Sequence, residues 1–346
     1  MSENLPIIGI SMGDPAGVGP EIIAKALGRP RVREICRPVV VGSADVMRAA
    51  GMIVGARLAV REIPSVDQAT FAHDAMEVIP ADPIPMAQVQ IGKVSAAAGR
   101  AAFEAVRKVI ELAMRRQIDA TVTVPIHKEA LALAGCPYPG HTEIFGELTG
   151  ARDVAMMLAA NGLRVVHVST HVSLREACDR VTADRVYKTI ELAHDACREL
   201  GIQQPKIGVA GLNPHASDGG LFGDEERVHI IPAVERARQQ GMNVSGPFPP
   251  DTFFAMAIGG AWDVCVAMYH DQGHIPVKIK GFRFDATKGA WRSINGINVS
   301  LGLPIIRTSV DHGTAFDQAG HGTASDESLV EAIDYAARMA RHRRNR

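Results

Sequence analysis

Short runs rich in valine and isoleucine alternate along this chain with longer segments whose apolar residues recur at helical spacing. Runs such as Pro6–Ser11 and Pro38–Gly42 have the length and composition of buried strands. The longer segments are Ala97–Gln117, Ala183–Leu200, Glu225–Gln240 and Ser325–His342. This alternation predicts an α/β fold, in which a largely parallel sheet carries helices on both faces.

The length of 346 residues corresponds to about two domains. We expect a boundary in the turn at Pro137–Gly140, because proline and glycine punctuate elements strongly there. The predicted first domain contains residues 1–136 and 300–346, since the last helix is expected to return to the first half. The predicted second domain contains residues 137–299.

The charge balance narrows the choice of partners. The formal net charge is −1, which argues against nucleic acid or an anionic membrane as the main partner. The five cysteines are scattered and form no C-x-x-C pair, so a disulfide framework is not indicated. The first residues lack a basic segment followed by a long apolar one. We therefore expect a cytoplasmic protein that does not enter a membrane.

Three strand-like runs each end on a histidine. They are Leu163–His171, Lys206–His215 and Asp263–His270. In open α/β sheets, ligands bind just outside the carboxyl ends of the strands. Three neutral imidazoles that meet there would hold a divalent metal and leave a position open for substrate. A fourth run, Ile118–His127, also ends on a histidine, so a histidine at a strand end need not be a ligand.

Other polar residues predict an anion-binding site. Gly140-His141-Thr142-Glu143 precedes a helix-like sequence, whose first amides could hold a phosphate or carboxylate. Lys278 lies eight residues after His270, and Arg307 closes the apolar run Leu303–Arg307. Such cations at the ends of buried runs are expected to face a cleft, where an arginine can bind an anion with two nitrogens.

Two glycine-rich stretches fit a nucleotide site only weakly when each is taken alone. Gly13–Glu21 is a turn between a strand and a helix, and Asp311–Ser325 leads into the last helix. Small residues let the backbone approach a ligand closely. The chain contains neither G-x-G-x-x-G nor a P-loop, so the usual nucleotide fingerprints are absent.

Taken together, the motifs resemble those of the 4-hydroxythreonine-4-phosphate dehydrogenase family and its catabolic relatives. They occur in order over nearly the whole chain: GDPAGVGPE, PIHKEAL, GHTE, GLNPHA, GPFPPDT, YHDQGHIPVK and GLPIIRTSVDHGTAFDQAG. The resemblance implies the two-domain α/β/α fold of isocitrate and isopropylmalate dehydrogenases. It also implies a homodimer with its site near the subunit interface.

The resemblance assigns roles to individual residues. The metal, expected to be Zn, Mg or Co, would be bound by His171, His215 and His270, one of them from the partner subunit. The residues that match substrate contacts are His141, Thr142, Lys278, Asn298 and Arg307. The NAD or NADP site would lie in the stretch Asp311–Gly322, with contacts from His312, Gly313, Thr314, Ala315, Asp317 and Gly320.

Two departures from the biosynthetic pattern bear on the substrate. The segment Ile279–Ile297, with Arg283, Lys288, Trp291 and Arg292, is longer than expected between Lys278 and Asn298. The stretch Ser217–Gly223 also looks closer to the catabolic relatives.

We expect oxidation of 4-phosphohydroxy-L-threonine, followed by decarboxylation to 3-amino-2-oxopropyl phosphate in pyridoxine biosynthesis. The alternatives are D-threonate or D-erythronate 4-phosphate, and an aromatic cis-dihydrodiol carboxylate such as that from terephthalate.

The expected mechanism is hydride transfer from a metal-bound hydroxyl to the nicotinamide. The candidate catalytic residues are Lys278, Asp251 and Asp271. Asp271 could instead orient the neighbouring imidazole of His270, and Asp251 could be a helix N-cap. A phosphoacyl transferase of related fold is the alternative from a different enzyme class, since it requires neither nicotinamide nor a histidine-bound metal.

Overall fold

The computed structural model describes residues 5–81, 84–287 and 290–344. Within them the chain divides into two compact units, each with helices and strands interleaved as the sequence predicts. The first unit contains the chain up to Arg152 and again from Leu303, and the second contains Asp153–Gly302. Residues 137–152, which the sequence analysis assigned to the second domain, belong to the first unit.

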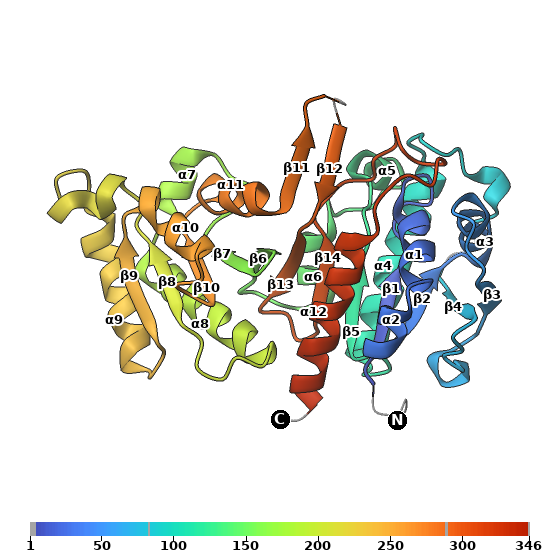
Figure 1. Cartoon of the computed structure of the whole chain (residues 1–346), viewed down its shortest axis with the longest axis horizontal. Coiled ribbons are helices and arrows are strands. Elements are labelled where there is room, and N and C mark those ends of the chain that lie inside the picture. Colours follow the sequence, from blue (N-terminus) through green and yellow to red (C-terminus); the bar gives the residue numbers. More distant parts are fainter. Residues whose placement is uncertain (1–4, 82–83, 288–289, 345–346) are drawn as a thin grey trace. The chain divides into compact units, whose positions relative to one another are not determined.

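The first unit is built on six parallel strands in the order β3-β4-β2-β1-β5-β14. The last of these comes from the far end of the chain and pairs with β5, which explains why this unit is discontinuous in sequence (Figure 1). The strands are β1 (Ile7–Ser11), β2 (Arg37–Gly42), β3 (Ala59–Glu62), β4 (Ala75–Pro80), β5 (Ala120–Thr123) and β14 (Arg307–Val310).

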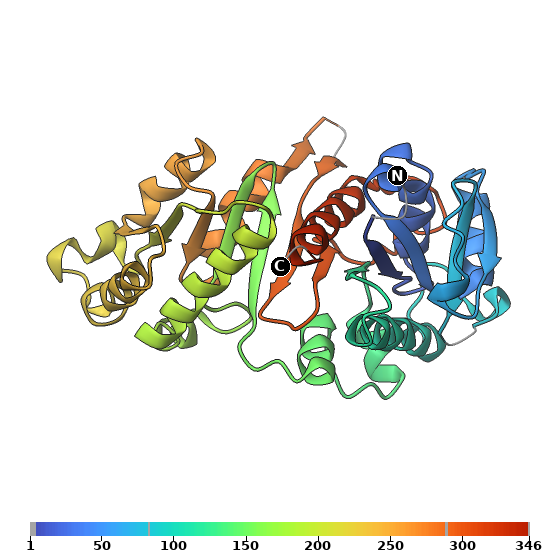
Figure 2. The same ribbon diagram turned by 90° about the horizontal axis from the view of Figure 1, so that it is seen from below.

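Helices cover both faces of this sheet. The long helices α4 and α12 lie on opposite faces (Figure 2), and each packs on β1 and β5. Gly9 of β1 allows α4 to pack closely, because a Cβ there would lie 2.8 Å from Val109 Cγ2. The helices are α1 (Gly19–Leu27), α2 (Pro30–Ile35), α3 (Ala44–Ile53), α4 (Ala96–Met114), α5 (Lys128–Leu133), α6 (His141–Thr149) and α12 (Glu327–Arg344).

The second unit has a six-stranded mixed sheet in the order β13-β6-β7-β10-β8-β9. β6 runs antiparallel to both of its neighbours, and the strands from β7 to β9 are parallel. The strands are β6 (Ala155–Ala160), β7 (Leu163–His167), β8 (Ile207–Ala210), β9 (Val244–Phe248), β10 (Val264–Ala267) and β13 (Ile297–Leu301).

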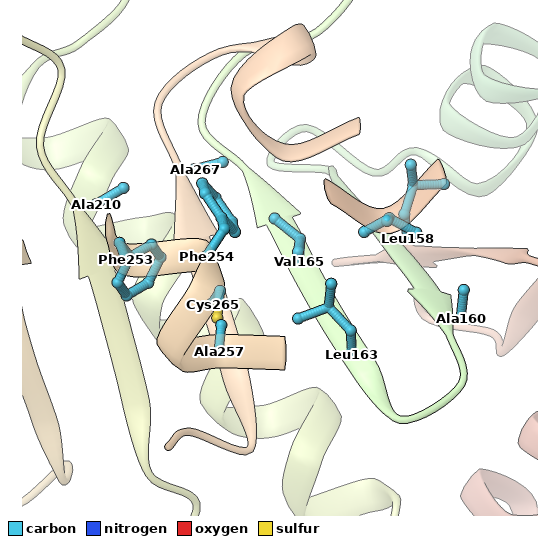
Figure 3. Close-up of a cluster of buried hydrophobic side chains, with 11 residues drawn as sticks. Leu158, Ala160, Leu163, Val165, Ala210, Phe253, Phe254, Ala257, Cys265 and Ala267 are labelled. Carbon is cyan, nitrogen blue, oxygen red and sulfur yellow. The ribbon is translucent and has the colours of Figure 1, made fainter. Parts of the chain in front are cut away.

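Helices α8, α10 and α11 pack on the sheet of the second unit. Figure 3 shows part of its core, where Phe253 and Phe254 of α10 lie beside Val165 and Cys265 of the strands. The helices are α7 (Leu174–Asp179), α8 (Ala183–Glu199), α9 (Ile231–Gln239), α10 (Pro250–Ile258) and α11 (His270–Gly281).

A separate two-stranded antiparallel sheet follows α11. It consists of β11 (Phe282–Asp285) and β12 (Ala290–Ile294), and it occupies the long segment singled out in the sequence between Lys278 and Asn298. Lys288 lies outside the described residues, and the side chains of Trp291 and Arg292 are not described either.

The predicted helices are present with small shifts of their ends. Glu225–Gln240 differs most, because it divides into a π-helical turn at Glu226–Ile230 and then α9. Pro232 lies in the first turn of α9, where a missing N–H is tolerated. No helix among the described residues is both long enough and apolar enough to span a bilayer.

Candidate functional site

A buried arginine is the centre of the anion-binding group predicted in the first unit. Arg307 is 3% exposed, and its Nη2 donates a hydrogen bond to Thr123 Oγ1 at 3.0 Å. The sequence analysis placed this residue at the end of an apolar run, but in the structure it is the first residue of β14. Its register partner is Thr121. The side chain therefore extends along β5 toward the carboxyl end of that strand.

The charge of Arg307 acts on the His141 imidazole. Burial, together with the charge of Arg307, holds the pKa of His141 well below its usual range. Burial also lowers the pKa of Arg307 to about 10, and Glu143 opposes that shift. Arg307 remains a cation at neutral pH, and its guanidinium lies 5.3 Å from the ring centre of Phe145.

The first turn of α6 adds backbone donors to this group. His141 is the first residue of α6, and its N-cap, Gly140, provides no side-chain cap. Among the described residues, His141 Nε2 is buried and has no hydrogen-bond partner. Thr142 is exposed in the same turn. A helix N-terminus, a buried cation and an unpartnered imidazole nitrogen together suit a phosphate or carboxylate.

The other two predicted substrate residues belong to the second unit. Lys278 is in α11, and its Nζ lies 4.3 Å from the ring centre of Phe282. Asn298 is in β13, opposite Leu158 of β6. Its Oδ1 is buried without a hydrogen-bond partner among the described residues. Asn298 therefore has an acceptor that a ligand could use.

The three predicted metal-binding histidines follow three neighbouring parallel strands, β7, β10 and β8. The rings of His171 and His270 lie together, with their centroids 5.7 Å apart. However, no group of three His, Cys, Asp or Glu side chains in the described part of one chain is arranged to hold a metal ion. One chain thus brings His171 close to His270 but does not assemble a site with His215.

Two further histidines, which the sequence analysis did not select, extend this group. The ring of His274 stacks on His270 at 3.5 Å, and its Nδ1 lies 3.2 Å from Nε2 of His167. His167 is buried, and α11 approaches it closely at Gly273. The spacing of four between His270 and His274 at the start of a helix is the sequence signal that places both on one face.

His215 occupies a strained turn after β8. His215, Ala216, Ser217 and Asp218 all have positive φ, between 47° and 71°. Left-handed backbone is unfavourable for such residues and is retained mainly at functional sites. The Glu226 carboxylate holds the start of this segment by accepting hydrogen bonds from two consecutive backbone amides, those of residues 212 and 213.

The stretch predicted to bind the nucleotide is attached to α1. The Glu21 carboxylate accepts hydrogen bonds from the amides of Gly320 and Gly322, at 2.6 and 2.8 Å. Lys25 Nζ donates to the carbonyl oxygen of Gly322 at 2.6 Å. Ala315, in the same stretch, has a φ of 43°, which lies in the left-handed region. The Gly320 amide, a predicted cofactor contact, is therefore already used by Glu21.

The candidate proton acceptors differ in their surroundings. Asp271 Oδ1 lies 2.7 Å from His270 Nδ1, as expected for a carboxylate that orients an imidazole. Asp251 is exposed in the first turn of α10, whose N-cap is Pro249. Asp251 is therefore not the N-cap considered in the sequence analysis.

Comparisons with known proteins agree with the motifs. Residues 34–336 match the family described as "Pyridoxal phosphate biosynthetic protein PdxA". The D-threonate 4-phosphate dehydrogenase of Cupriavidus necator is 46% identical over 344 residues, which cover 99% of this chain and 100% of that protein.

Solved structures are also similar to this chain over nearly its whole length. The crystal structure of a 4-hydroxythreonine-4-phosphate dehydrogenase from Burkholderia phymatum is 44% identical, with a TM-score of 0.83, and covers 97% of this chain and 98% of that one. A terephthalate 1,2-cis-dihydrodiol dehydrogenase from Burkholderia xenovorans is 32% identical, with a TM-score of 0.67, over 96% and 97% of the two chains.

Proposed function

This chain belongs to the PdxA family of pyridoxal phosphate biosynthetic proteins, and we propose that it oxidises the secondary hydroxyl of a phosphorylated hydroxy acid. It is a dehydrogenase, as are the relatives that are 44% and 46% identical to it. D-threonate 4-phosphate is the substrate that we propose, because the Cupriavidus necator relative is named for it.

The observation that carries this proposal is the buried Arg307 of β14 together with the buried, unpartnered Nε2 of His141 at the N-terminus of α6. A buried cation attracts an anionic ligand more strongly than an exposed one, because the surrounding dielectric constant is low. A substrate phosphate would accept hydrogen bonds from Arg307, from His141 Nε2–H and from the hydroxyl of Thr142. These contacts would hold the substrate so that its reacting C–H bond faces the hydride acceptor. Lys278 and Asn298 are proposed as further substrate contacts.

A second candidate is 4-phosphohydroxy-L-threonine, which would place the enzyme in pyridoxine biosynthesis. The Burkholderia phymatum structure, named for that substrate's dehydrogenase, favours it at 44% identity. Both candidates end in a phosphate, so the Arg307 group serves either. The dihydrodiol carboxylate is a weaker alternative, because the relative named for it is 32% identical.

We propose a divalent metal, Zn, Mg or Co, held by His171, His215 and His270. The imidazoles of His171 and His270 fit part of such a donor set, and the set would be completed by a histidine from a second copy of the chain. When bound, the metal would act as a Lewis acid on the substrate hydroxyl. Asp271 keeps the His270 ring in place through its contact with Nδ1.

The hydride acceptor that we propose is NAD or NADP, bound along Asp311–Gly322. Attachment of this stretch to α1 by Glu21 and Lys25 supports it, since a fixed backbone can present its groups to a nucleotide. The proton acceptor would be Lys278, Asp271 or Asp251. Asp271 contacts the His270 ring, and Asp251 is exposed to solvent, whereas Lys278 is half-buried. We therefore favour Lys278.

A second copy of the chain is the partner that we propose. Ile275 and Ile279 of α11 are 55% and 63% exposed, and Phe284 of β11 is 57% exposed. A dimer that covers this apolar surface would also place His270 near the interface. Sedimentation should show a dimer, and Ile279→Asp should shift it toward monomer while an exposed control, Met52→Asp in the first unit, should not.

The test of the function is a substrate panel with NAD and with NADP, followed by absorbance of the reduced nicotinamide. D-threonate 4-phosphate should be oxidised with a kcat/KM at least about 10-fold above that of 4-phosphohydroxy-L-threonine and of D-threonate without phosphate. Preference for 4-phosphohydroxy-L-threonine would support the second candidate. Phosphoacyl transfer without nicotinamide reduction would contradict both.

The Arg307→Lys variant tests the proposed role of Arg307 in phosphate binding. Arg307→Lys keeps a charge but loses the planar pair of donors, so kcat/KM for the phosphorylated substrate should fall about 10- to 100-fold. The kcat/KM for D-threonate without phosphate should change much less.

Chelation of the metal should abolish activity, and addition of Zn, Mg or Co should restore it. Full activity after complete metal removal would refute the metal proposal.

A further inference from the structure

Helix α11 packs directly on strand β7 in the second unit, where His167 is the last residue of the strand. Gly273 permits this close contact, because a Cβ there would lie 2.3 Å from His167 Nε2. The helix begins at His270, which we propose as a metal ligand. The contacts that fix α11 on β7 therefore also place a residue of the proposed metal site.

Hydrogen bonds determine which nitrogen carries the proton in His167 and in His274. His167 Nδ1 lies 3.2 Å from the carbonyl oxygen of Met156, and it donates because a carbonyl only accepts. His274 Nδ1 lies 3.0 Å from the carbonyl oxygen of His270 and donates for the same reason. The same Nδ1 lies 3.2 Å from His167 Nε2, which must be the acceptor, since two N–H groups repel each other. His274 is thus held by two acceptors at once.

The ring of His274 covers one face of the His270 ring. The two rings are stacked, with centroids 3.5 Å apart and planes 14° from parallel. A helical side chain leans back over the preceding turn, and the bond to the His270 carbonyl keeps the His274 ring there. The edge of the His270 ring is held separately, because its Nδ1 lies 2.7 Å from Asp271 Oδ1. His270 is therefore restrained on one face and on one edge.

These restraints decide where the His270 lone pair points. The second side-chain torsion of histidine is broad, so the rotamer alone does not fix the ring. Because Nδ1–H donates to Asp271, Nε2 is the nitrogen that could bind a metal. The His171 ring lies at a centroid distance of 5.7 Å and is tilted by 50°. Two such rings share one metal only when both lone pairs converge on it.

We propose that His274 is a positioning residue, which holds the His270 imidazole in the orientation that divalent metal binding requires, and that His167 anchors His274. This inference rests on the proposed function, which includes the metal. His274 is not assigned as a ligand beside His270, because lone pairs in the planes of two nearly parallel rings do not meet at one point. It acts on the metal only through His270.

The test is the Kd of Zn²⁺, measured on the metal-free full chain by competition with a chromophoric chelator. His274→Ala removes both the stacked ring and the donor, so the Kd should rise about 10- to 100-fold, as is typical when a residue that orients a ligand is lost. His274→Phe places a flat ring on His270 again without the donor. It should recover at least about threefold of that loss.

Gly273→Ala tests the anchoring by His167 while all the imidazoles stay in the chain. Alanine favours a helix, but its Cβ would collide with His167 Nε2 and displace α11. The Kd of Zn²⁺ should therefore rise at least about threefold. Gly51→Ala in α3 is the matched control, because the nearest atom to its Cβ would be 3.8 Å away. That variant should bind Zn²⁺ like the wild type.

Further measurements separate positioning from a loss of folding. His194 of α8 is half-buried, and its Nδ1 also lies near a carboxylate, at 3.4 Å from Asp195 Oδ1, so His194→Ala is a control that should keep the Zn²⁺ affinity. The Kd of NADH should stay within about twofold in every variant, because the stretch Asp311–Gly322 belongs to the first unit. The visible spectrum of bound Co²⁺, which reports ligand geometry, should change in His274→Ala.

Equal Zn²⁺ affinity in the wild type and in His274→Ala would overturn the proposal, as would an equal loss in His194→Ala. No recovery in His274→Phe, unchanged affinity in Gly273→Ala, or a parallel loss of NADH binding would also contradict it. If the wild type binds Zn²⁺ no more tightly than His270→Ala does, the metal proposal fails as well. If the wild type binds Zn²⁺ through His270 and His274→Ala binds it equally, only this inference fails.

Discussion

The turn that contains His215 has an unfavourable backbone conformation at several consecutive residues. Four consecutive residues without the freedom of glycine adopt left-handed backbone there, and two glycines with positive φ follow them. Each left-handed residue of this kind costs about 1 kcal/mol relative to glycine. A turn of this kind is retained when it aims a side chain, which supports the functional role proposed for His215.

Asp218→Gly should therefore stabilise the protein by about 1 kcal/mol, because Asp218 is exposed and its φ is 47°. The measurement is the free energy of unfolding in denaturant. The matched control is Asp184→Gly in the first turn of α8, which should destabilise by a similar amount or more, because glycine disfavours a helix. Stabilisation in both variants, or in neither, would show that the backbone of residue 218 is not strained.

At the scale of elements, the stretch Asp311–Gly322 depends on α1 for its conformation. Glu21 is buried in α1, and its two oxygens accept from amides about 300 positions later in the chain. The glycine-rich stretch Gly13–Glu21, which ends in α1 with Glu21, thus supports the glycine-rich stretch before α12. In the sequence each of these stretches was a weak indication of a nucleotide site, and the structure joins them into one assembly in the first unit.

Glu21→Ala should release this stretch. Hydrogen bonds to a charged group contribute about 1.5–3 kcal/mol each, so amide exchange of residues 313–322 should accelerate at least about 10-fold. Hydrogen exchange followed by mass spectrometry measures this directly, and the Kd of NADH should rise in parallel. Glu129→Ala, in the exposed first turn of α5, is the control. Unchanged exchange in Glu21→Ala would mean that other contacts hold the stretch.

At the scale of the whole molecule, buried histidines link folding to pH. Burial, with the charge of His274 and more weakly those of His270 and His171, lowers the pKa of His167 to about 3, against the bond to the Met156 carbonyl. The folded state keeps this ring neutral, whereas the unfolded chain protonates it below pH 6.5. Stability is therefore complete above about pH 6.5 and is lost as the pH falls toward 3.

We expect the free energy of unfolding to fall by about 1.4 kcal/mol per pH unit for this one group between pH 6 and 4. His167→Gln should reduce the slope of the stability against pH by about that amount, although it lowers the stability at pH 7. Denaturant titrations at several pH values give the slope. His73→Gln, at an exposed histidine, is the control and should leave it unchanged.

The sequence by itself determined the α/β class, the alternation of strands and helices along the chain, and the motifs that identify the family. These follow from local periodicity and from residue types at fixed spacing, which any stretch of the chain displays on its own. The sequence also selected His141 and Arg307, because a glycine before a helix and an arginine after an apolar run are local signals. Their electrostatic coupling was not visible there, since 165 positions separate them in the chain.

Only the tertiary structure decided which distant residues meet. It brought His171 to His270, added His274 and His167 to that group, and left one chain without a complete metal site among the described residues. It also buried Asp14 beside the β5 loop that carries His127. The physical reason is that strand order and helix packing set these contacts through buried apolar surface, and no local pattern encodes the partner of a buried polar atom.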